Sequence, residues 1–403
     1  MLTIYSATIV MTMKVLVLGG YGAVGEVICA DLAATPSISE VVCAGRSPNK
    51  AKRLAKKLNR DKIIPKKLDA GKSNELMDAL KEVDIVINSS LPRYNLAVMD
   101  AALEKGVHYI DNAVYTTVDD KLKFDDAWKD AGLTALLNLG EDPGLSNIYA
   151  RYAADGMDRV EEIRIRDGET CEGEYPFIAT FSPHVFLGGE IFLNPLIFEN
   201  GEFKHLPPFS GREVYEFPEP IGPVTVYCTD HEETETLPRF IKKGVKYTDF
   251  KLAFSPETVE LLQTLNQIGL MSSKPIDVKG VEVSPLDVFI ALIPSPNEIA
   301  GKVKGYACIL ADVRGEKAGE RIRHVVYAFM SHEDAYKKLG VTATAYLTGI
   351  PASVGAAMLA EGKIKRRGVF PPEVLEPEPF FKEVRKKDIV TYEKMTVMRS
   401  LNR

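Results

Sequence analysis

The sequence of 403 residues has few of the features that mark specialised proteins. Its five cysteines are scattered without a CxxC pair, which argues against a disulfide scaffold and favours reduced thiols in a cytoplasmic protein. No His/Cys/Asp/Glu cluster has metal-ligand spacing, so no metal site is expected. The net charge is -6 and no basic stripe is present, which argues against a nucleic-acid binder. No run is apolar enough to predict a membrane span.

The N-terminal stretch lacks the basic start of a signal peptide. We expect residues 1–12 to be an extension that is either disordered or mis-started, with Met11 or Met13 as a plausible true start.

What the sequence does contain, from Lys14 to about Leu139, is a regular alternation of short apolar runs and helical stretches. "KVLVLG", "SEVVCA", "DKIIPKKLD", "DIVINSS", "VHYID" and "LTALLNLG" predict strands, each separated from the next by a predicted helix. This alternation predicts an α/β fold with a doubly wound parallel sheet, the Rossmann fold, whose ligand lies beyond the carboxyl ends of the strands.

After about Val160 the pattern predicts strands of a mixed sheet with Pro- and Gly-rich connections, followed by a helix of small residues, "TATAYLTGIPASVGAAMLAEG". Small residues allow close backbone approach, so we expect this helix to pack on the first domain. The predicted organisation is a Rossmann domain over 13–142 completed by a returning segment over 340–385. A second α+β domain over 143–339 would bind substrate and mediate dimerisation.

A glycine-rich loop, "GGYGAVG", follows the first predicted strand and opens the first helix. In this context it predicts dinucleotide binding, because glycines permit the tight turn and the helix N-terminus offers free N–H groups to the pyrophosphate. A glycine-rich turn without a ligand is the alternative. The predicted contacts are Gly20, Tyr21, Gly22, Ala23, Val24 and Gly25.

The end of the second strand lacks the acid that usually accepts from the adenosine ribose. Gly45 removes the repulsion that an acid would exert on a 2′-phosphate, Arg46 is able to cover that phosphate, and Ser47 is able to donate a hydroxyl. NADP(H) is therefore predicted to be preferred over NAD(H); if Arg46 is only a solvated loop residue, both cofactors would bind.

The cofactor site is expected to extend along two further strand ends. Asp69 either meets the adenine amino group or caps the next helix. The loop after the fourth strand is expected to line the nicotinamide ribose or to be ordinary loop sequence, and it comprises Asn88, Ser89, Ser90 and Leu91.

Beyond these residues the chain resembles the saccharopine dehydrogenase family, whose members transfer hydride at amino-acid C–N bonds. The resemblance runs from Met13 to about Phe381 and rests on "GGYGAVGEVICADLA", "DIVINSSLPRYN" with "GVHYID", "LNLGEDPGLSN", "HEETETLPRF" and "GKIKRRGVFPPE". The "EDPG" stretch is similar to saccharopine reductases, whereas the short middle domain and "RRGVFPPE" look closer to lysine 6-dehydrogenases.

Hydride transfer from a C–N bond requires a neutral amine, hence a base. His231 has a suitable intrinsic pKa, and the resemblance favours its loop as part of the site over a solvated acidic turn. Asp142 is expected to bind a substrate ammonium or relay a proton, or to cap a helix starting at Pro143. Further substrate contacts are expected from Glu233, Arg239 and Arg366, although a basic residue after a helix often only complements its dipole.

The sequence thus predicts an NADP-dependent oxidoreductase of amino-acid metabolism, acting on a saccharopine-like opine. The alternatives are a lysine 6-dehydrogenase that deaminates the ε-amine and a non-catalytic NADP(H)-sensing protein. A small amino-acid substrate and a homodimer are expected, without nucleic-acid or membrane partners.

Overall fold

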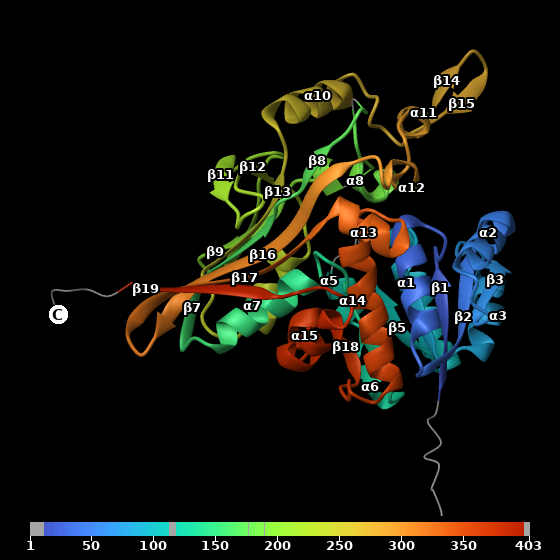
Figure 1. Ribbon diagram of the computed structural model, residues 1–403, viewed down its shortest axis with the longest axis horizontal. Coiled ribbons are helices and arrows are strands. Elements are labelled where there is room, and N and C mark those ends of the chain that lie inside the picture. Colours follow the sequence, from blue (N-terminus) through green and yellow to red (C-terminus); the bar gives the residue numbers. More distant parts are fainter. Residues whose placement is uncertain (1–11, 113–117, 176, 189, 399–403) are drawn as a thin grey trace, which may run out of the picture.

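The computed structural model describes residues 12–112, 118–175, 177–188 and 190–398, so all but Thr12 of the predicted N-terminal extension lies outside the described residues. Figure 1 shows two sheets side by side: a sheet wrapped by helices, and a larger curved sheet that carries the C-terminus. An α/β Rossmann domain with a second, mixed-sheet domain is confirmed.

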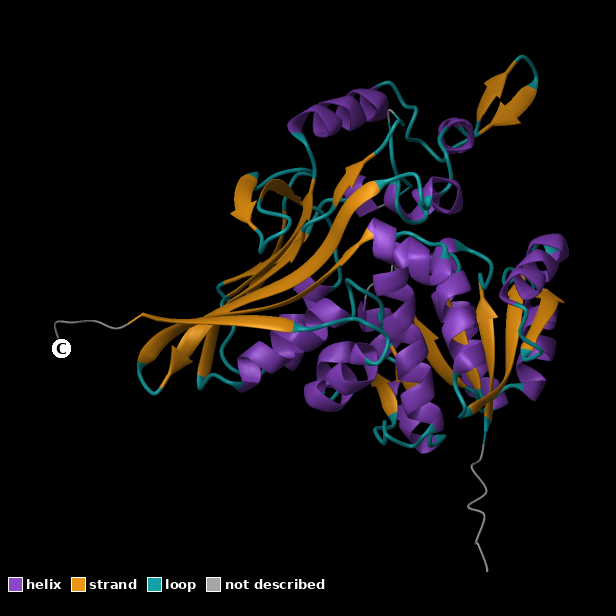
Figure 2. Cartoon of the chain, in the orientation of Figure 1, coloured by secondary structure: helices purple, strands orange, loops and turns teal. Residues whose placement is uncertain are grey.

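The first sheet is parallel throughout and has the order β18-β6-β5-β4-β1-β2-β3. Its inner strands are short apolar runs buried on both faces, as expected where helices cover both sides (Figure 2), whereas the edge strand β3 is largely accessible. The bounds are β1 Met13–Leu18, β2 Ile38–Gly45, β3 Ile63–Lys67, β4 Ile85–Asn88, β5 His108–Asp111, β6 Thr134–Leu136 and β18 Gly368–Phe370.

Two of the helices around this sheet show how caps and glycines fix helix ends. Ser47 caps α2 by accepting from the backbone N–H of Lys50, and Gly106 ends α4 in the left-handed conformation. The helices are α1 Ala23–Ala34, α2 Pro48–Leu58, α3 Ser73–Ala79, α4 Asn95–Lys105, α5 Val118–Leu122, α6 Asp125–Asp130, α14 Ala343–Ala360 and α15 Pro377–Arg385, with short 3-10 turns at η1 Leu80–Glu82, η2 Pro92–Tyr94 and η4 Pro372–Val374.

The C-terminal segment returns to the first domain. A side chain at Gly349 of α14 would lie 2.6 Å from the Cβ of Val27 on α1, so glycine sets how closely these helices approach. Ser353 also donates to Asp31 of α1 at 2.7 Å, and β18 adds the seventh strand beside β6. By length and composition α14 is apolar enough to cross a membrane, contrary to the sequence prediction, but 83% of it is buried inside the protein.

The second sheet has ten strands, of which seven follow the order β10-β9-β13-β7-β16-β17-β19. α7 packs on one face, next to the long β16–β17 pair (Figure 1). The final strand, β19, was not predicted. The strands are β7 Arg159–Asp167, β8 Thr170–Glu172, β9 Leu196–Glu199, β10 Glu202–His205, β11 Glu213–Glu216, β12 Pro223–Cys228, β13 Tyr247–Ala253, β16 Lys304–Lys317, β17 Glu320–Ser331 and β19 Tyr392–Met398.

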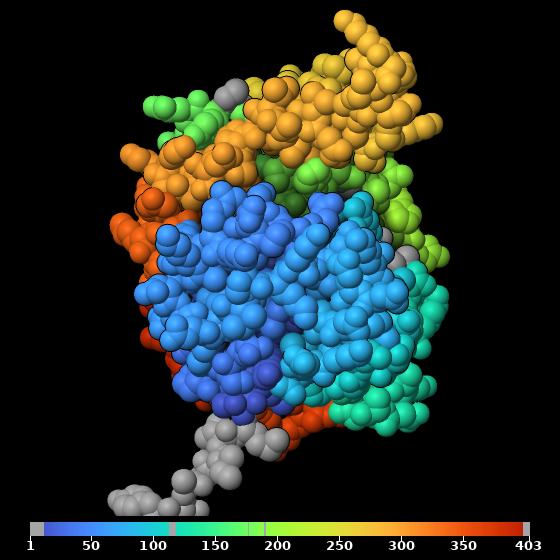
Figure 3. Space-filling model, turned by 90° about the vertical axis from the view of Figure 1, so that its right-hand side faces the viewer, coloured from blue at the N-terminus to red at the C-terminus, as the bar shows by residue number. Residues whose placement is uncertain are grey.

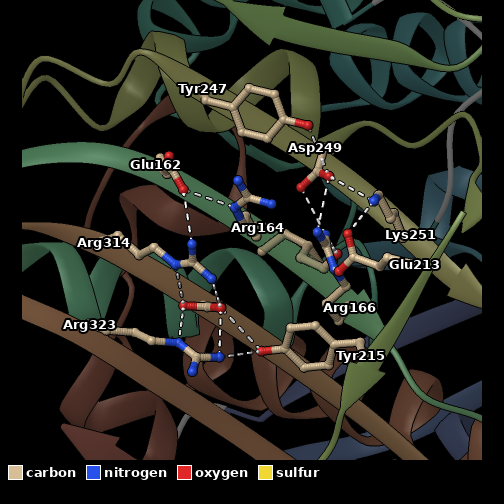
Figure 4. Close-up of polar contacts among 12 residues, drawn as sticks. Glu162, Arg164, Arg166, Glu213, Tyr215, Tyr247, Asp249, Lys251, Arg314 and Arg323 are labelled. Atoms are coloured by element: carbon tan, nitrogen blue, oxygen red, sulfur yellow. Dashed lines mark hydrogen bonds and ion pairs between the residues drawn. The ribbon is translucent and has the colours of Figure 1, made fainter. Parts of the chain in front are cut away.

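The other face of this sheet carries a network of ion pairs (Figure 4). Arg166 of β7 and Asp249 of β13 are both fully buried, and the guanidinium donates to the two carboxylate oxygens at 2.8 and 3.0 Å. Asp312 of β16 accepts from Arg314 and Arg323. The Arg166–Asp249 and Arg323–Asp312 pairs, both bidentate, connect neighbouring strands through side chains as well as backbone.

The remaining elements lie at the edges of the second sheet or project from it. Residues 256–299 form an arm that ends in the two-stranded sheet β14–β15, at the upper right of Figure 1. The elements are α7 Leu145–Asp155, α8 Pro183–Phe186, η3 Glu190–Phe192, α9 Glu233–Phe240, α10 Pro256–Gln267, β14 Ile276–Val278, β15 Val281–Val283, α11 Pro285–Leu292, α12 Pro296–Ile299 and α13 His332–Leu339.

Candidate active site

A continuous cavity of about 500 Å³ joins the carboxyl edge of the first sheet to the second domain. In Figure 3 a recess with green segments at its floor separates the blue Rossmann domain from the gold arm above it. Most of the predicted cofactor residues line it, namely Tyr21, Gly22, Ala23, Val24, Gly25, Gly45, Arg46, Asp69, Asn88, Ser89, Ser90 and Leu91. Gly20 and Ser47 lie just outside the lining.

The glycine loop has the close backbone packing that a dinucleotide site requires. A Cβ at Gly25 would overlap the carbonyl oxygen of Gly19, and a Cβ at Gly19 would overlap that of Ser89. The loop after β1, the start of α1 and the loop after β4 therefore meet without intervening side chains. The exposed N-terminus of α1 at the cavity fits the pyrophosphate of a nicotinamide dinucleotide.

Tyr21 explains why β2 ends in glycine. A Cβ at Gly45 would lie 2.5 Å from the Tyr21 ring, and the Tyr21 hydroxyl accepts from the backbone N–H of Ser47 at 2.9 Å. The Ser47 hydroxyl oxygen caps α2 by accepting from the backbone N–H of Lys50, which leaves its O–H able to donate, so the predicted role of Ser47 toward the cofactor stays a prediction. Arg46 and Lys50 both line the cavity here and are exposed.

Two further strand ends shape the nucleotide side. The amide oxygen of Asn88 accepts from the backbone and hydroxyl of Ser90, and its nitrogen donates to Asn95 at 2.6 Å. Asn88 thus fixes the loop after β4 against the cavity. Asp69 accepts from the backbone N–H of Gly71, and α3 begins at Ser73 without a side-chain cap, so the helix-cap alternative for Asp69 is wrong.

The far half of the cavity is acidic. Four carboxylates line it: Asp142 after β6, Asp167 at the end of β7, and Asp230 and Glu232 after β12. Burial is the main cause that raises the pKa of Asp142, of Asp230 and of Glu232, the last to about 8, and neighbouring carboxylates raise those of Asp142 and Glu232 further. The lining thus favours a cationic ligand, whose charge would offset this repulsion.

Behind this wall lies Glu141, which is buried and whose two carboxylate oxygens have no hydrogen-bond partner among the described residues. Burial, followed by the charges of Asp167 and Glu169, raises its pKa well above the usual range. The acidity therefore extends below the surface of the cavity.

His231 also lines the cavity, and its orientation is fixed on two sides. Its Nδ1 lies 2.6 Å from a carboxylate oxygen of Glu233, and its ring stacks on Phe250 with centroids 3.8 Å apart and planes 10° apart. With Nδ1 bonded to a carboxylate, Nε2 is the nitrogen suited to exchange a proton with a ligand.

Several predicted roles do not fit the structure. Glu233 is fully buried outside the lining and starts helix α9, so this segment is not a solvated loop. Arg239 pairs with Asp119 and Glu235, and Arg366 lies over the ring of Phe370; neither lines the cavity.

Asp142 does not cap a helix, because α7 begins at Leu145 with Gly144 at the N-cap position.

The expectation that no His/Cys/Asp/Glu cluster has metal-ligand spacing is also wrong: ligand atoms of His231, Glu232 and Glu233 lie within 4.8 Å of one another. Both oxygens of Glu233 already accept, from His231 and Ser146, and we assign no metal there.

Apart from His231, sequence reasoning missed the residues that the second domain and the returning helix contribute to the cavity. Asp167 ends a strand, like the residues recognised in the first domain, but its partner strands were not known. The others lie in β13, in the short helices α8 and α12, in loops beside them, or in the returning helix α14, and include Phe181, Ser182, Pro183, Leu252, Ser295, Asn297, Thr344 and Thr348.

Two models of known protein families match this chain. The Saccharopine dehydrogenase NADP binding domain matches residues 15–136, and the Saccharopine dehydrogenase C-terminal domain matches residues 140–390. The chain belongs to the saccharopine dehydrogenase family. It is accordingly an oxidoreductase with a nicotinamide cofactor, and the segment that matches the NADP binding domain contains the glycine loop.

Among curated members of this family, the chain is similar to enzymes of polyamine chemistry. It is 30% identical to the carboxyaminopropylagmatine dehydrogenase of Synechocystis sp., covering 91% of this chain and 94% of the relative. It is 31% identical to the carboxynorspermidine synthase of Vibrio cholerae, with 90% and 92% coverage.

Solved structures show the same fold at lower identity. Saccharopine dehydrogenase (L-Glu forming) from Saccharomyces cerevisiae has a TM-score of 0.72 at 18% identity, covering 95% of this chain and all of that chain. The homospermidine synthase from Legionella pneumophila, in complex with NAD, has a TM-score of 0.68 at 14% identity, covering 96% and 91%.

Proposed function

We propose that this protein makes or oxidises the secondary amine of a carboxylated polyamine, with NADP(H) as hydride carrier. The observation that carries the proposal is the division of charge in the cavity. Among the described lining residues, the lysine and arginine side chains are Lys50 and Arg46, both at the nucleotide end, whereas four carboxylates line the far half. Such a site favours a substrate with several cationic nitrogens.

This distribution disfavours the substrate expected from the sequence. Saccharopine carries several carboxylates, which bind best to arginine forks. Arg239 and Arg366, the residues expected to hold them, point to partners outside the cavity. Lysine has a single side-chain amine and a carboxylate, and would leave most of the acidic wall without a counter-charge.

The two curated relatives support the same class of substrate. Their names describe agmatine bearing a carboxyaminopropyl group and a carboxylated norspermidine. Oxidation of the secondary amine of the former to an imine by NADP⁺, followed by hydrolysis of the imine, gives agmatine and the amino-acid aldehyde 2-amino-4-oxobutanoate. We infer that this chain joins an amine of this kind to such an aldehyde.

The reaction balances as two steps. The primary amine and the aldehyde lose water to form an imine; hydride from NADPH, together with one proton, then gives the secondary amine and NADP⁺. The bound nicotinamide supplies the hydride. His231 donates the proton through Nε2 in this direction and accepts it in the reverse direction, when the amine must be neutral before oxidation.

Asp142 and Asp167 hold a substrate ammonium beside the reacting carbon, and Asp230 and Glu232 hold the outer end of the amine. Phe181 and Leu252 supply apolar walls for the methylene groups between the charges. A bound ammonium offsets the repulsion between neighbouring carboxylates and therefore favours their ionised form.

Preference for NADP(H) follows from Arg46 and Lys50. Both line the cavity at the end of β2, where the Tyr21 ring leaves no room for an acidic side chain at position 45. A 2′-phosphate would gain two cationic neighbours.

We also propose a homodimer formed through the second sheet, since its edge strands β10 and β19 offer unpaired backbone groups. Sedimentation of the protein as a monomer at micromolar concentration would overturn this part.

The test of the proposed function measures NADPH oxidation with 2-amino-4-oxobutanoate and agmatine, putrescine or 1,3-diaminopropane. Parallel reactions use lysine with 2-oxoglutarate, and lysine with NADP⁺. D167N should raise the KM for the amine far more than that for NADPH, whereas D277N, on the exposed β14, should change neither. Turnover of the lysine mixtures alone would overturn the proposal, and NADPH binding without any turnover would favour the non-catalytic sensor.

A further inference from the structure

Glu233 is a fully buried carboxylate that touches the site from behind rather than lining it. One oxygen lies 2.6 Å from Nδ1 of His231, and the other accepts from the Ser146 hydroxyl at 2.7 Å. The carboxylate is thus fixed at both oxygens, one of which faces the ring that lines the cavity.

The residues that hold Glu233 are themselves buried and bonded. Ser146 and Asn147 occupy the first turn of α7, and the amide oxygen of Asn147 accepts from the backbone N–H of Gly144 at 2.9 Å. The amide nitrogen donates to Thr236 of α9 and to Glu373 of η4, at 3.2 and 3.0 Å. Asn147 thus joins three elements from distant parts of the sequence beside the Ser146–Glu233 bond.

We propose that Glu233 is a positioning residue that keeps the proton of neutral His231 on Nδ1 and stabilises the imidazolium when Nε2 takes up the proton of the amine. The proposal rests on the proposed function for the identity of the amine, while the His231–Glu233 pair itself is independent of it. Ser146 serves as the support that prevents Glu233 from rotating away.

Two features of the surroundings make Glu233 the residue that determines the orientation of the His231 ring. The stacked ring of Phe250 restricts rotation of the imidazole, so that Nδ1 remains directed at the carboxylate. Asp142, Asp230 and Glu232 also act on His231 through their charge and line the cavity; an oxygen of Glu232 lies 3.9 Å from Nδ1, farther than the 2.6 Å of Glu233. Ligand binding changes their charge, whereas Glu233 remains enclosed.

The experiment compares E233Q, E233D and S146A with the wild type, and E235Q serves as the matched control. Glu235 lies on the same helix, pairs with Arg239 and does not line the cavity. E233Q should lower kcat by roughly 10²-fold with little change in the KM of the amine. The kinetic pKa of the base should fall, E233D should recover part of the loss, and E235Q should match the wild type.

A readout that does not depend on turnover is the ¹⁵N spectrum of the six histidines, in which H231N identifies the His231 signals. Wild type should show the Nδ1–H form of the neutral ring, and E233Q a mixture of tautomers with a lower imidazole pKa. If E233Q keeps the wild-type tautomer and pH profile, the proposal is overturned. If the wild type turns over no amine but shows the Nδ1–H form that E233Q loses, the proposed function fails and the positioning role stands.

Discussion

Binding of a polyamine should release protons from the acidic half of the cavity. Burial, reinforced by the charge of Glu233, raises the pKa of Glu232 to about 8. At pH 7 this carboxyl is therefore about nine-tenths protonated in the ligand-free enzyme. A bound ammonium favours the carboxylate and lowers its pKa, so the proton leaves as the amine enters.

The number of protons released follows from the pKa of Glu232. Glu232 alone should release about 0.9 proton per amine at pH 7, and Asp142, whose pKa is also raised, adds to this. Release from Glu232 should fall toward zero above pH 9, where the carboxyl is already ionised while an amine with a pKa of about 10.4 remains largely charged. Amine affinity should accordingly weaken as the pH falls, up to about tenfold for each unit below 8.

The assay is isothermal titration calorimetry of agmatine into the enzyme–NADPH complex without aldehyde, so that no hydride is transferred. Titrations in phosphate and in Tris at pH 7 give the number of protons released from the difference in apparent enthalpy. E232Q should remove about 0.9 proton from that number, while D277N should leave it unchanged. Equal enthalpies in the two buffers, with a flat affinity from pH 6 to 9, would refute the reasoning.

Three further predictions concern the nucleotide and the fold. R46A should reduce the ratio of kcat/KM for NADPH over NADH roughly 10- to 100-fold through loss of a charge-assisted bond worth about 1.5–3 kcal/mol, and an unchanged ratio would count against the role of Arg46. G25V should abolish NADPH binding measured by fluorescence while leaving the circular dichroism spectrum unchanged, because its Cβ would overlap the carbonyl of Gly19. D249N should lower the free energy of unfolding in urea by about 3 kcal/mol by leaving the buried Arg166 without its bidentate partner, and the double variant R166M/D249N should regain part of that loss.

The first domain could be predicted from the sequence because its signals are local. Strand–helix alternation and the glycine loop have fixed spacing, and each strand contacts helices that follow it closely in the chain. Even the return of α14 was predictable from its small residues, whose spacing requires a closely packed neighbour such as Val27. These features place the nucleotide half of the cavity within a few residues of where it is found.

The substrate half could not be predicted in the same way because its chemistry depends on long-range contacts. Asp167 and His231 line the same cavity only because β7 and β12 both pair with β13. No local sequence pattern predicts these two strand pairings. Arg239 looked like a carboxylate anchor, yet its side chain is directed toward Asp119 from another domain. Glu233 was expected to contact the substrate and is instead buried outside the cavity lining, where it accepts from Ser146 of α7.

The return of the chain to the first sheet has a consequence for how this protein is made. A ribosome delivers β1 to β6 early, but β18 and α14 leave it only when most of the second domain has already emerged. Until then the face of α1 around Val27 lacks the packing of α14 and is exposed in the nascent nucleotide domain. The domain that begins the chain is thus among the last to be completed. A truncated protein that ends near residue 136, where the first family match ends, would lack α14 and β18 and with them part of the core of its own domain.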